Sequence, residues 1–193
     1  MKKRPSPKAK SKFNYLKLLP ALLIFAASIL VRSAPSVASI TKPSSVLGYA
    51  TSISVGDLLA GTNSQRSANG VASLALNTKL INAAQAKAND MVARDYWSHT
   101  TPDGQQPWVF ITQAGYSYRA AGENLAYGFA TSSDTITGWM NSPPHKENLL
   151  KTTFNDVGFG IANSANYVGT GQQTVVVAMY GSLSSSSSSC SAA

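Results

Sequence analysis

Gly122-Glu-Asn-Leu-Ala126 lies between two other short motifs, and this arrangement is the basis for the fold and the site predicted from the chain. Ser98-His-Thr-Thr-Pro-Asp-Gly104 precedes it, and Trp139-Met-Asn-Ser-Pro-Pro-His145 follows it. Each outer motif contains one of the chain's two histidines, and the middle motif contains a glutamate. Because imidazole and carboxylate groups readily share protons and divalent metals near neutral pH, the three motifs predict one assembled site.

The positive charge of the chain is concentrated at its start. The 16 Lys and Arg residues outnumber the 8 Asp and Glu residues, which gives a formal net charge of +8. Half of the basic residues lie before position 39, where there is no acidic residue, so the remainder of the chain is neutral. Non-specific binding to nucleic acid requires a basic face that neutralises phosphates. The sequence therefore argues against nucleic acid as a partner.

Residues 1–38 have the layout of a secretory signal. A basic start leads into the apolar run Leu18–Val31, and Ser36-Val-Ala38 provides a small-x-small cleavage site. The run is shorter than the roughly 20 residues that usually span a membrane. An uncleaved signal anchor with its cationic end in the cytoplasm is the alternative. In both cases we expect an extracellular domain, either secreted or tethered to the membrane by the N-terminal segment.

Composition divides the rest of the chain into three parts. Residues 39–54 are rich in Ser, Thr, Pro and Gly and predict a linker. Residues 55–181 are sufficient for one domain with its own core, which we expect to be a monomer. Residues 182–193 form a Ser-rich tail that contains Cys190, the only cysteine. An intramolecular disulfide is therefore impossible, whereas an intermolecular one stays open.

Capping residues and apolar periodicity predict helices in the first part of the domain and strands in the second. The helices are expected over residues 55–69, 78–95, 108–114 and 132–142, and the strands over residues 157–161 and 174–180. The second strand is rich in β-branched residues and is expected at the centre of an antiparallel sheet. We interpret Gly122–Ala126 as a loop. Helices followed by strands indicate the α+β class.

Together these motifs resemble the CAP superfamily in its bacterial form, also called the SCP or cysteine-rich secretory, antigen 5 and pathogenesis-related 1 group. The resemblance covers about Leu58 to Tyr180. It rests on the order and spacing of Asn63-x-x-Arg66, Gly70, Ser98-His99, Pro102-Asp-Gly104, Gly115-Tyr116, Gly122-Glu-Asn-Leu-Ala126, Trp139, Ser142, His145, Asn148-Leu-Leu150 and Val157-Gly-Phe-Gly160. It implies a three-layer α-β-α sandwich with a central antiparallel sheet and an open cleft.

The same resemblance implies that two histidines and two acidic residues lie on the floor of the cleft. His99, Glu123 and His145 match three of them, and Ser142 stands where animal and plant members have the second acid. No cofactor is required. His99 and His145 are candidate ligands for a weakly bound zinc or other divalent cation. A purely structural role, in which Glu123 accepts backbone amides of its loop, stays open.

Three functional classes fit these residues. We favour an exported binding or effector module whose cleft takes a lipid or other small hydrophobic molecule, a peptide or a cell-envelope component. A metal-dependent hydrolase using His99, His145 and Glu123 is the first alternative, although Ser142 removes a candidate general base. A structural surface protein with a vestigial site is the second. A nucleophile mechanism has little support, because sequence neighbours do not establish a triad.

Overall fold

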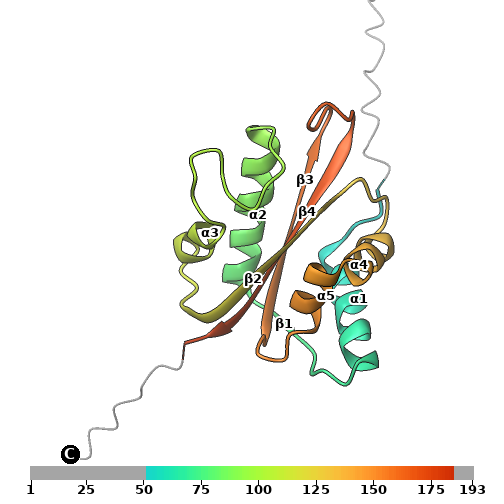
Figure 1. The fold of residues 1–193 in the computed structure, drawn as a ribbon, viewed down its shortest axis with the longest axis vertical. Coiled ribbons are helices and arrows are strands. Elements are labelled where there is room, and N and C mark those ends of the chain that lie inside the picture. The colour runs from blue at the N-terminus through green and yellow to red at the C-terminus, as the bar shows by residue number, and fades with distance from the viewer. Residues whose placement is uncertain (1–50, 185–193) are drawn as a thin grey trace, which may run out of the picture. The chain divides into compact units, whose positions relative to one another are not determined.

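The computed structural model describes residues 51–184, which form five helices and four strands (Figure 1). In chain order these are α1 (Val55–Ala68), β1 (Ala75–Leu76), α2 (Thr78–Ala93), α3 (Trp108–Gln113), β2 (Tyr118–Tyr127), α4 (Ser132–Asn141), α5 (Pro143–Leu150), β3 (Asp156–Ser164) and β4 (Gln173–Leu183). The predicted signal, most of the predicted linker and the predicted tail beyond Ser184 lie outside the described residues.

The strands form one sheet in the order β1-β3-β4-β2. β4 is antiparallel to both β3 and β2, and the β3–β4 hairpin agrees with the sequence prediction. β1 adds a parallel edge of only two residues, in which Ala75 is paired with Asp156 and Leu76 with Val157. The α+β class is confirmed, and the predicted antiparallel sheet becomes a mixed one through this short edge strand.

Alternation along β4 produces two apolar cores, one on each face of the sheet. Val175, Val177 and Met179 join the cluster supplied by α2 and α3, and Val176, Ala178 and Tyr180 join the cluster supplied by α1, α4 and α5. Figure 1 shows α2 and α3 on one side of the strands and the other three helices on the opposite side. The three-layer sandwich expected from the family resemblance is therefore confirmed.

Local capping explains where most of the helices begin. Ser54 Oγ accepts a hydrogen bond from the Asp57 amide at the start of α1, and Asn77 caps α2 through the Lys79 amide. The sequence predicts the cap of α4 at Ser132 or Ser133, but the structure places it at Thr131. Ser132 Oγ instead accepts the backbone N–H of Ser54, 78 residues away in the sequence.

The structure corrects two local predictions. Gly122–Ala126 lies within β2, not in a loop, and is paired with β4 from Gly122 opposite Tyr180 to Ala126 opposite Val176. The motif has few strand-favouring residues, so its conformation depends on the β-rich partner strand. The second correction is α5, a helix that is not among those expected from the sequence: Pro143 and Pro144 occupy its first positions, where a missing N–H costs nothing.

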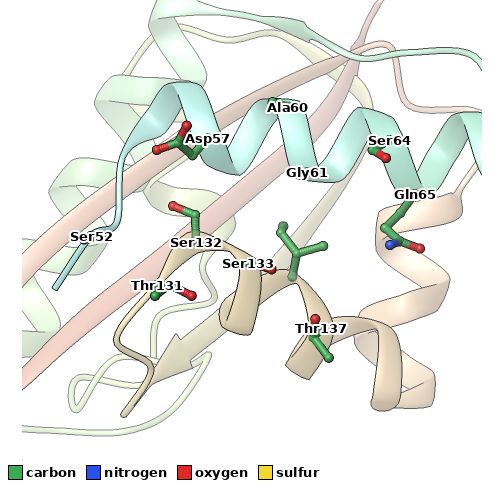
Figure 2. A pocket seen from close by; sticks show the side chains of 11 residues that line it. Ser52, Asp57, Ala60, Gly61, Ser64, Gln65, Thr131, Ser132, Ser133 and Thr137 are labelled. Atoms are coloured by element: carbon green, nitrogen blue, oxygen red, sulfur yellow. The ribbon is translucent and has the colours of Figure 1, made fainter.

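A groove runs between α1 and α4 on the face of the sheet that these helices cover (Figure 2). A Cβ on Gly61 would lie 3.1 Å from the Ile136 side chain, so the glycine allows the two helices to approach closely. The groove encloses about 480 Å³, and several serine and threonine side chains line it together with Asp57. Between residues 51 and 184, no helix combines the length and apolar character needed to cross a membrane.

Candidate functional site

A second cleft, of about 350 Å³, lies beside β2 and brings parts of three sequence motifs together. The loop after α2 supplies His99, β2 supplies Glu123, and α5 supplies Asn148. The lining residues are His99, Gln106, Pro107, Trp108, Ala121, Gly122, Glu123 and Asn148. His99 and Glu123 therefore line the same cleft, whereas His145 is not among the residues that line it.

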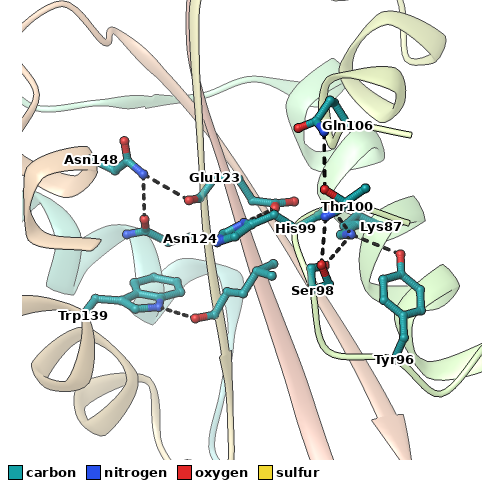
Figure 3. A network of polar contacts seen from close by, with 11 residues as sticks. Lys87, Tyr96, Ser98, His99, Thr100, Gln106, Glu123, Asn124, Trp139 and Asn148 are labelled. Atoms are coloured by element: carbon teal, nitrogen blue, oxygen red, sulfur yellow. Dashed lines mark hydrogen bonds and ion pairs between the residues drawn. The ribbon is translucent and has the colours of Figure 1, made fainter. Parts of the chain in front are cut away.

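His99 and Glu123 form a direct contact. Nδ1 of His99 lies 2.6 Å from Oε1 of Glu123 (Figure 3). When Glu123 is a carboxylate, Nδ1–H is the donor in this contact, and in the neutral ring Nε2 is then the acceptor nitrogen. The Glu123 side chain is only 1% exposed, whereas that of His99 is 54% exposed. The imidazole therefore connects a buried acid with solvent.

The environment of Glu123 leaves part of its hydrogen-bonding capacity unused. Burial raises the pKa of Glu123, against the opposing influence of the His99 hydrogen bond and of the nearby positive charge of Lys87. Its Oε2 is buried and has no hydrogen-bond partner within residues 51–184. Because buried polar atoms are usually paired, this unpaired oxygen marks Glu123 as an unusual carboxylate among the described residues.

Two asparagines connect β2 to α5. Asn148 Nδ2 donates to the backbone oxygen of Glu123 and to Oδ1 of Asn124, both at 3.0 Å. Asn124 Nδ2 in turn donates to the backbone oxygen of His145 at 2.9 Å. The amides thus hold the backbone of the strand that carries Glu123 against the helix that carries His145, and Figure 3 shows Asn124 and Asn148 beside Glu123.

Ser142 lies at the junction of α4 and α5, and His145 lies in the first turn of α5. Ser142 is both the C-cap of α4 and the N-cap of α5, and its side chain makes no capping hydrogen bond. Nowhere in residues 51–184 do three His, Cys, Asp or Glu side chains form a group that could hold a metal ion. The described residues therefore do not provide the three-ligand set of a catalytic zinc. The weaker two-histidine site stays a prediction.

Comparison with known proteins identifies the fold family. The model of the family described as CAP, cysteine-rich secretory protein family, matches residues 59–180. The chain belongs to this family. Its CAP domain therefore contains all four positions that the sequence analysis singled out, His99, Glu123, Ser142 and His145.

Two proteins of Bacillus subtilis (strain 168) are similar to this CAP domain. YkwD is 33% identical over 126 residues, which cover 65% of this chain and 47% of YkwD. The membrane protein YlbC is 27% identical over 100 residues, which cover 52% of this chain and 29% of YlbC. This chain thus spans less than half the length of either relative.

Solved structures of CAP proteins share the fold at lower sequence identity. An extracellular protein containing an SCP domain from Bacillus anthracis str. Ames has a TM-score of 0.58 at 23% identity, covering 66% of this chain and 39% of that one. An outer surface protein from Borrelia burgdorferi has a TM-score of 0.59 at 23% identity, covering 66% of this chain and 90% of that one. At these identities the likeness establishes the fold alone.

The CAP domain should lose stability in acid partly through His145. Burial lowers the pKa of His145, and the charge of His99 lowers it further. The neutral imidazole is therefore favoured in the folded state, and its contribution is present above the unfolded pKa of about 6.5 and is lost as the pH falls through the lowered folded pKa. We expect thermal scans at about pH 7.5 and about pH 5 to show a smaller loss for His145→Gln than for the native chain.

The matched control for this measurement is Lys146→Gln, which changes the neighbouring exposed residue. We expect Lys146→Gln to lose as much stability between the two pH values as the native chain does. An identical pH dependence in all three proteins would contradict the role assigned to His145.

Proposed function

We propose that this chain is an exported binding module whose CAP domain takes a polar ligand of the cell envelope in the cleft above His99 and Glu123. The observation that supports the proposal most directly is the arrangement of this pair. A half-exposed imidazole covers a buried carboxylate that still has one unpaired oxygen within the described residues 51–184. Such a pair presents an imidazole nitrogen at the opening of the cleft and holds it against a buried carboxylate.

The chemistry of the lining favours a saccharide or a short peptide over a lipid. Gln106 and Asn148 add amide groups to His99 and Glu123, and the partly buried Trp108 adds one apolar surface. A cleft for an alkyl chain would be lined mainly by apolar side chains, whereas this one converges several polar groups on a small volume. Polymers of the bacterial cell wall contain both saccharide and peptide parts and suit this lining.

Binding without chemistry is favoured because the residues around the pair are already used for structure. Ser98 Oγ accepts the backbone N–H of Thr100, and within the described residues no hydrogen bond joins it to the His99 ring as a nucleophile–base pair would require. The alternative of a metal-dependent hydrolase would require His145 to join His99 and Glu123 as a third ligand. The third possibility, a vestigial site on a structural protein, predicts no binding in the experiment below.

Export is part of the same proposal. Residues 1–38 have the layout of a secretory signal, and the two structural neighbours are described as an extracellular protein and an outer surface protein. We expect a mature chain that begins near Ser39 or stays tethered by residues 18–31, with the CAP domain outside the cytoplasm. Recovery of the intact chain from the cytoplasm of the native cell would contradict this part.

Co-sedimentation with purified bacterial peptidoglycan sacculi tests the binding function. We expect the native protein to sediment with the sacculi and His99→Ala and Glu123→Gln to lose most of this retention, because each removes one member of the pair. Gln65→Ala is the matched control, since Gln65 lines the other groove and should not affect retention.

Phosphatidylglycerol vesicles in a parallel assay separate a wall ligand from a lipid one. Retention on vesicles but not on sacculi would contradict the proposed ligand class. Equal retention of the native protein and both site variants on sacculi would contradict the proposed site.

A further inference from the structure

Lys87 is a fully buried cation that none of the roles described so far requires. It lies on α2, in the row of small and apolar residues that faces the sheet, and its residue exposure is 0%. Isolated lysine side chains are almost never buried in this way, because an ammonium group loses its hydration. Its burial in the CAP domain therefore calls for compensating contacts.

Those contacts account for all three protons of the ammonium group. Nζ donates to Tyr96 Oη at 3.0 Å, to the backbone oxygen of Ser98 at 2.9 Å and to the backbone oxygen of His99 at 2.8 Å (Figure 3). The Tyr96 hydroxyl in turn donates a hydrogen bond to Oδ2 of Asp90 at 2.6 Å. Burial lowers the pKa of Lys87, and the positive charge of Arg94 lowers it further, whereas the negative charges of Glu123 and Asp90 act in the opposite direction and favour the charged form.

The two carbonyls that Lys87 binds belong to the peptide groups on either side of the His99 Cα. Fixing both carbonyls fixes the direction in which the His99 side chain leaves the backbone. Without these bonds, an exposed loop residue would be free to adopt other backbone conformations, at a cost in conformational entropy when it is ordered again. Lys87 does not itself reach the cleft, because it is not among the residues that line it.

We propose that Lys87 is the positioning residue of the cleft, and that its buried ammonium fixes the two peptide groups around His99 so that Nδ1 faces Glu123 and Nε2 faces the ligand. This inference rests on the proposed function only in assigning His99 as a ligand contact. A binding group held in advance loses less entropy when the ligand arrives. Lys87 therefore contributes to binding without touching the ligand.

The tautomer of His99 is the direct readout. In ¹⁵N-labelled native protein under conditions where the ring is neutral, we expect the imidazole resonances of the Nδ1–H form, because Glu123 accepts from Nδ1. Lys87→Met keeps the apolar stem but removes the three donors, and we expect it to lose the Nδ1–H signature of His99. Tyr96→Phe is the matched control, since it removes one contact of Lys87 but leaves both carbonyl bonds, and it should keep the native tautomer.

A structural control accompanies the tautomer measurement. Trp139 Nε1 donates to the Leu125 backbone oxygen in the core on the other side of the sheet, so its indole resonance reports whether the fold persists. If Lys87→Met does not fold, Lys87→Arg and Lys87→Gln are compared instead. Arginine keeps charged donors, whereas glutamine has only a neutral amide. We expect more of the native tautomer in the arginine variant.

Two outcomes would overturn the inference. One is an unchanged Nδ1–H signature in folded Lys87→Met, and the other is an equal signature in the arginine and glutamine variants. Sacculus retention provides a second measure, in which Lys87→Met should lose as much as His99→Ala and the double variant should lose no more. Since the tautomer is measured without ligand, failure of native retention would contradict the proposed function and leave this result standing.

Discussion

Gly160→Ala and Gly158→Ala are each expected to prevent folding of the CAP domain or to lower its free energy of unfolding by more than about 3 kcal/mol. Both glycines lie in β3, directly against the backbone of α2. A Cβ at position 160 would come closer than 3.0 Å to the backbone of Ala84, and one at position 158 to that of Leu80. Neither element can move away, because β3 is hydrogen-bonded within the sheet and α2 is packed on the face of the sheet.

Gly56→Ala is the matched control for these variants. Gly56 lies in the first turn of α1, and a Cβ there would meet nothing closer than Ser54 Oγ at 4.0 Å. We expect a gain of about 0.5 to 1 kcal/mol, because alanine restricts the unfolded chain and favours the helix. Urea unfolding of the purified proteins measures all three changes. Normal stability of Gly160→Ala would show that α2 and β3 can separate.

Arg66→Met is expected to lower the free energy of unfolding by more than about 3 kcal/mol. The Arg66 residue is 0% exposed, and its guanidinium donates only to backbone carbonyls. Nε binds Ala72 at 2.7 Å, Nη1 binds Leu149 at 2.8 Å and Lys151 at 3.0 Å, and Nη2 binds Phe154 at 3.3 Å. Methionine fills similar space but leaves these carbonyls without their donors.

Thermal and urea unfolding of Arg66→Met, Arg66→Lys and Arg119→Met test this prediction. Lysine keeps the charge, but a single ammonium cannot reproduce the planar set of donors, so we expect an intermediate loss. Arg119 lies exposed on β2, and its replacement should change the stability by less than about 0.5 kcal/mol. Equal stability of the Arg66 and Arg119 variants would contradict the role of Arg66 as a link between α1 and the end of α5.

Much of the candidate site could be predicted from the sequence, but its geometry could not. The motifs predict one site from His99, Glu123 and His145, and the structure places Nδ1 of His99 and Oε1 of Glu123 2.6 Å apart. The environment of Glu123 was not predictable, since the strand β2 was interpreted as a loop. Lys87 falls beside the apolar stripe of α2, and a single lysine at such a position carries no signal for the two carbonyls that it binds.

The sequence by itself determined the features that depend on residues close together in the chain. The caps Ser54 and Asn77, the helices that they begin and the β3–β4 hairpin all follow from local hydrogen bonding and periodicity. These contacts join residues that are close together in the chain, so a local pattern is sufficient to predict them, although packing supplies most of their stability.

Only the tertiary structure decided the features that join distant segments. β2 is a strand because β4 pairs with it, and Gly158 and Gly160 are required because α2 lies against them. Arg66 binds a carbonyl 83 positions later in the chain. Such contacts depend on which surfaces are brought together by tertiary packing, so they cannot be predicted from a local pattern in the sequence.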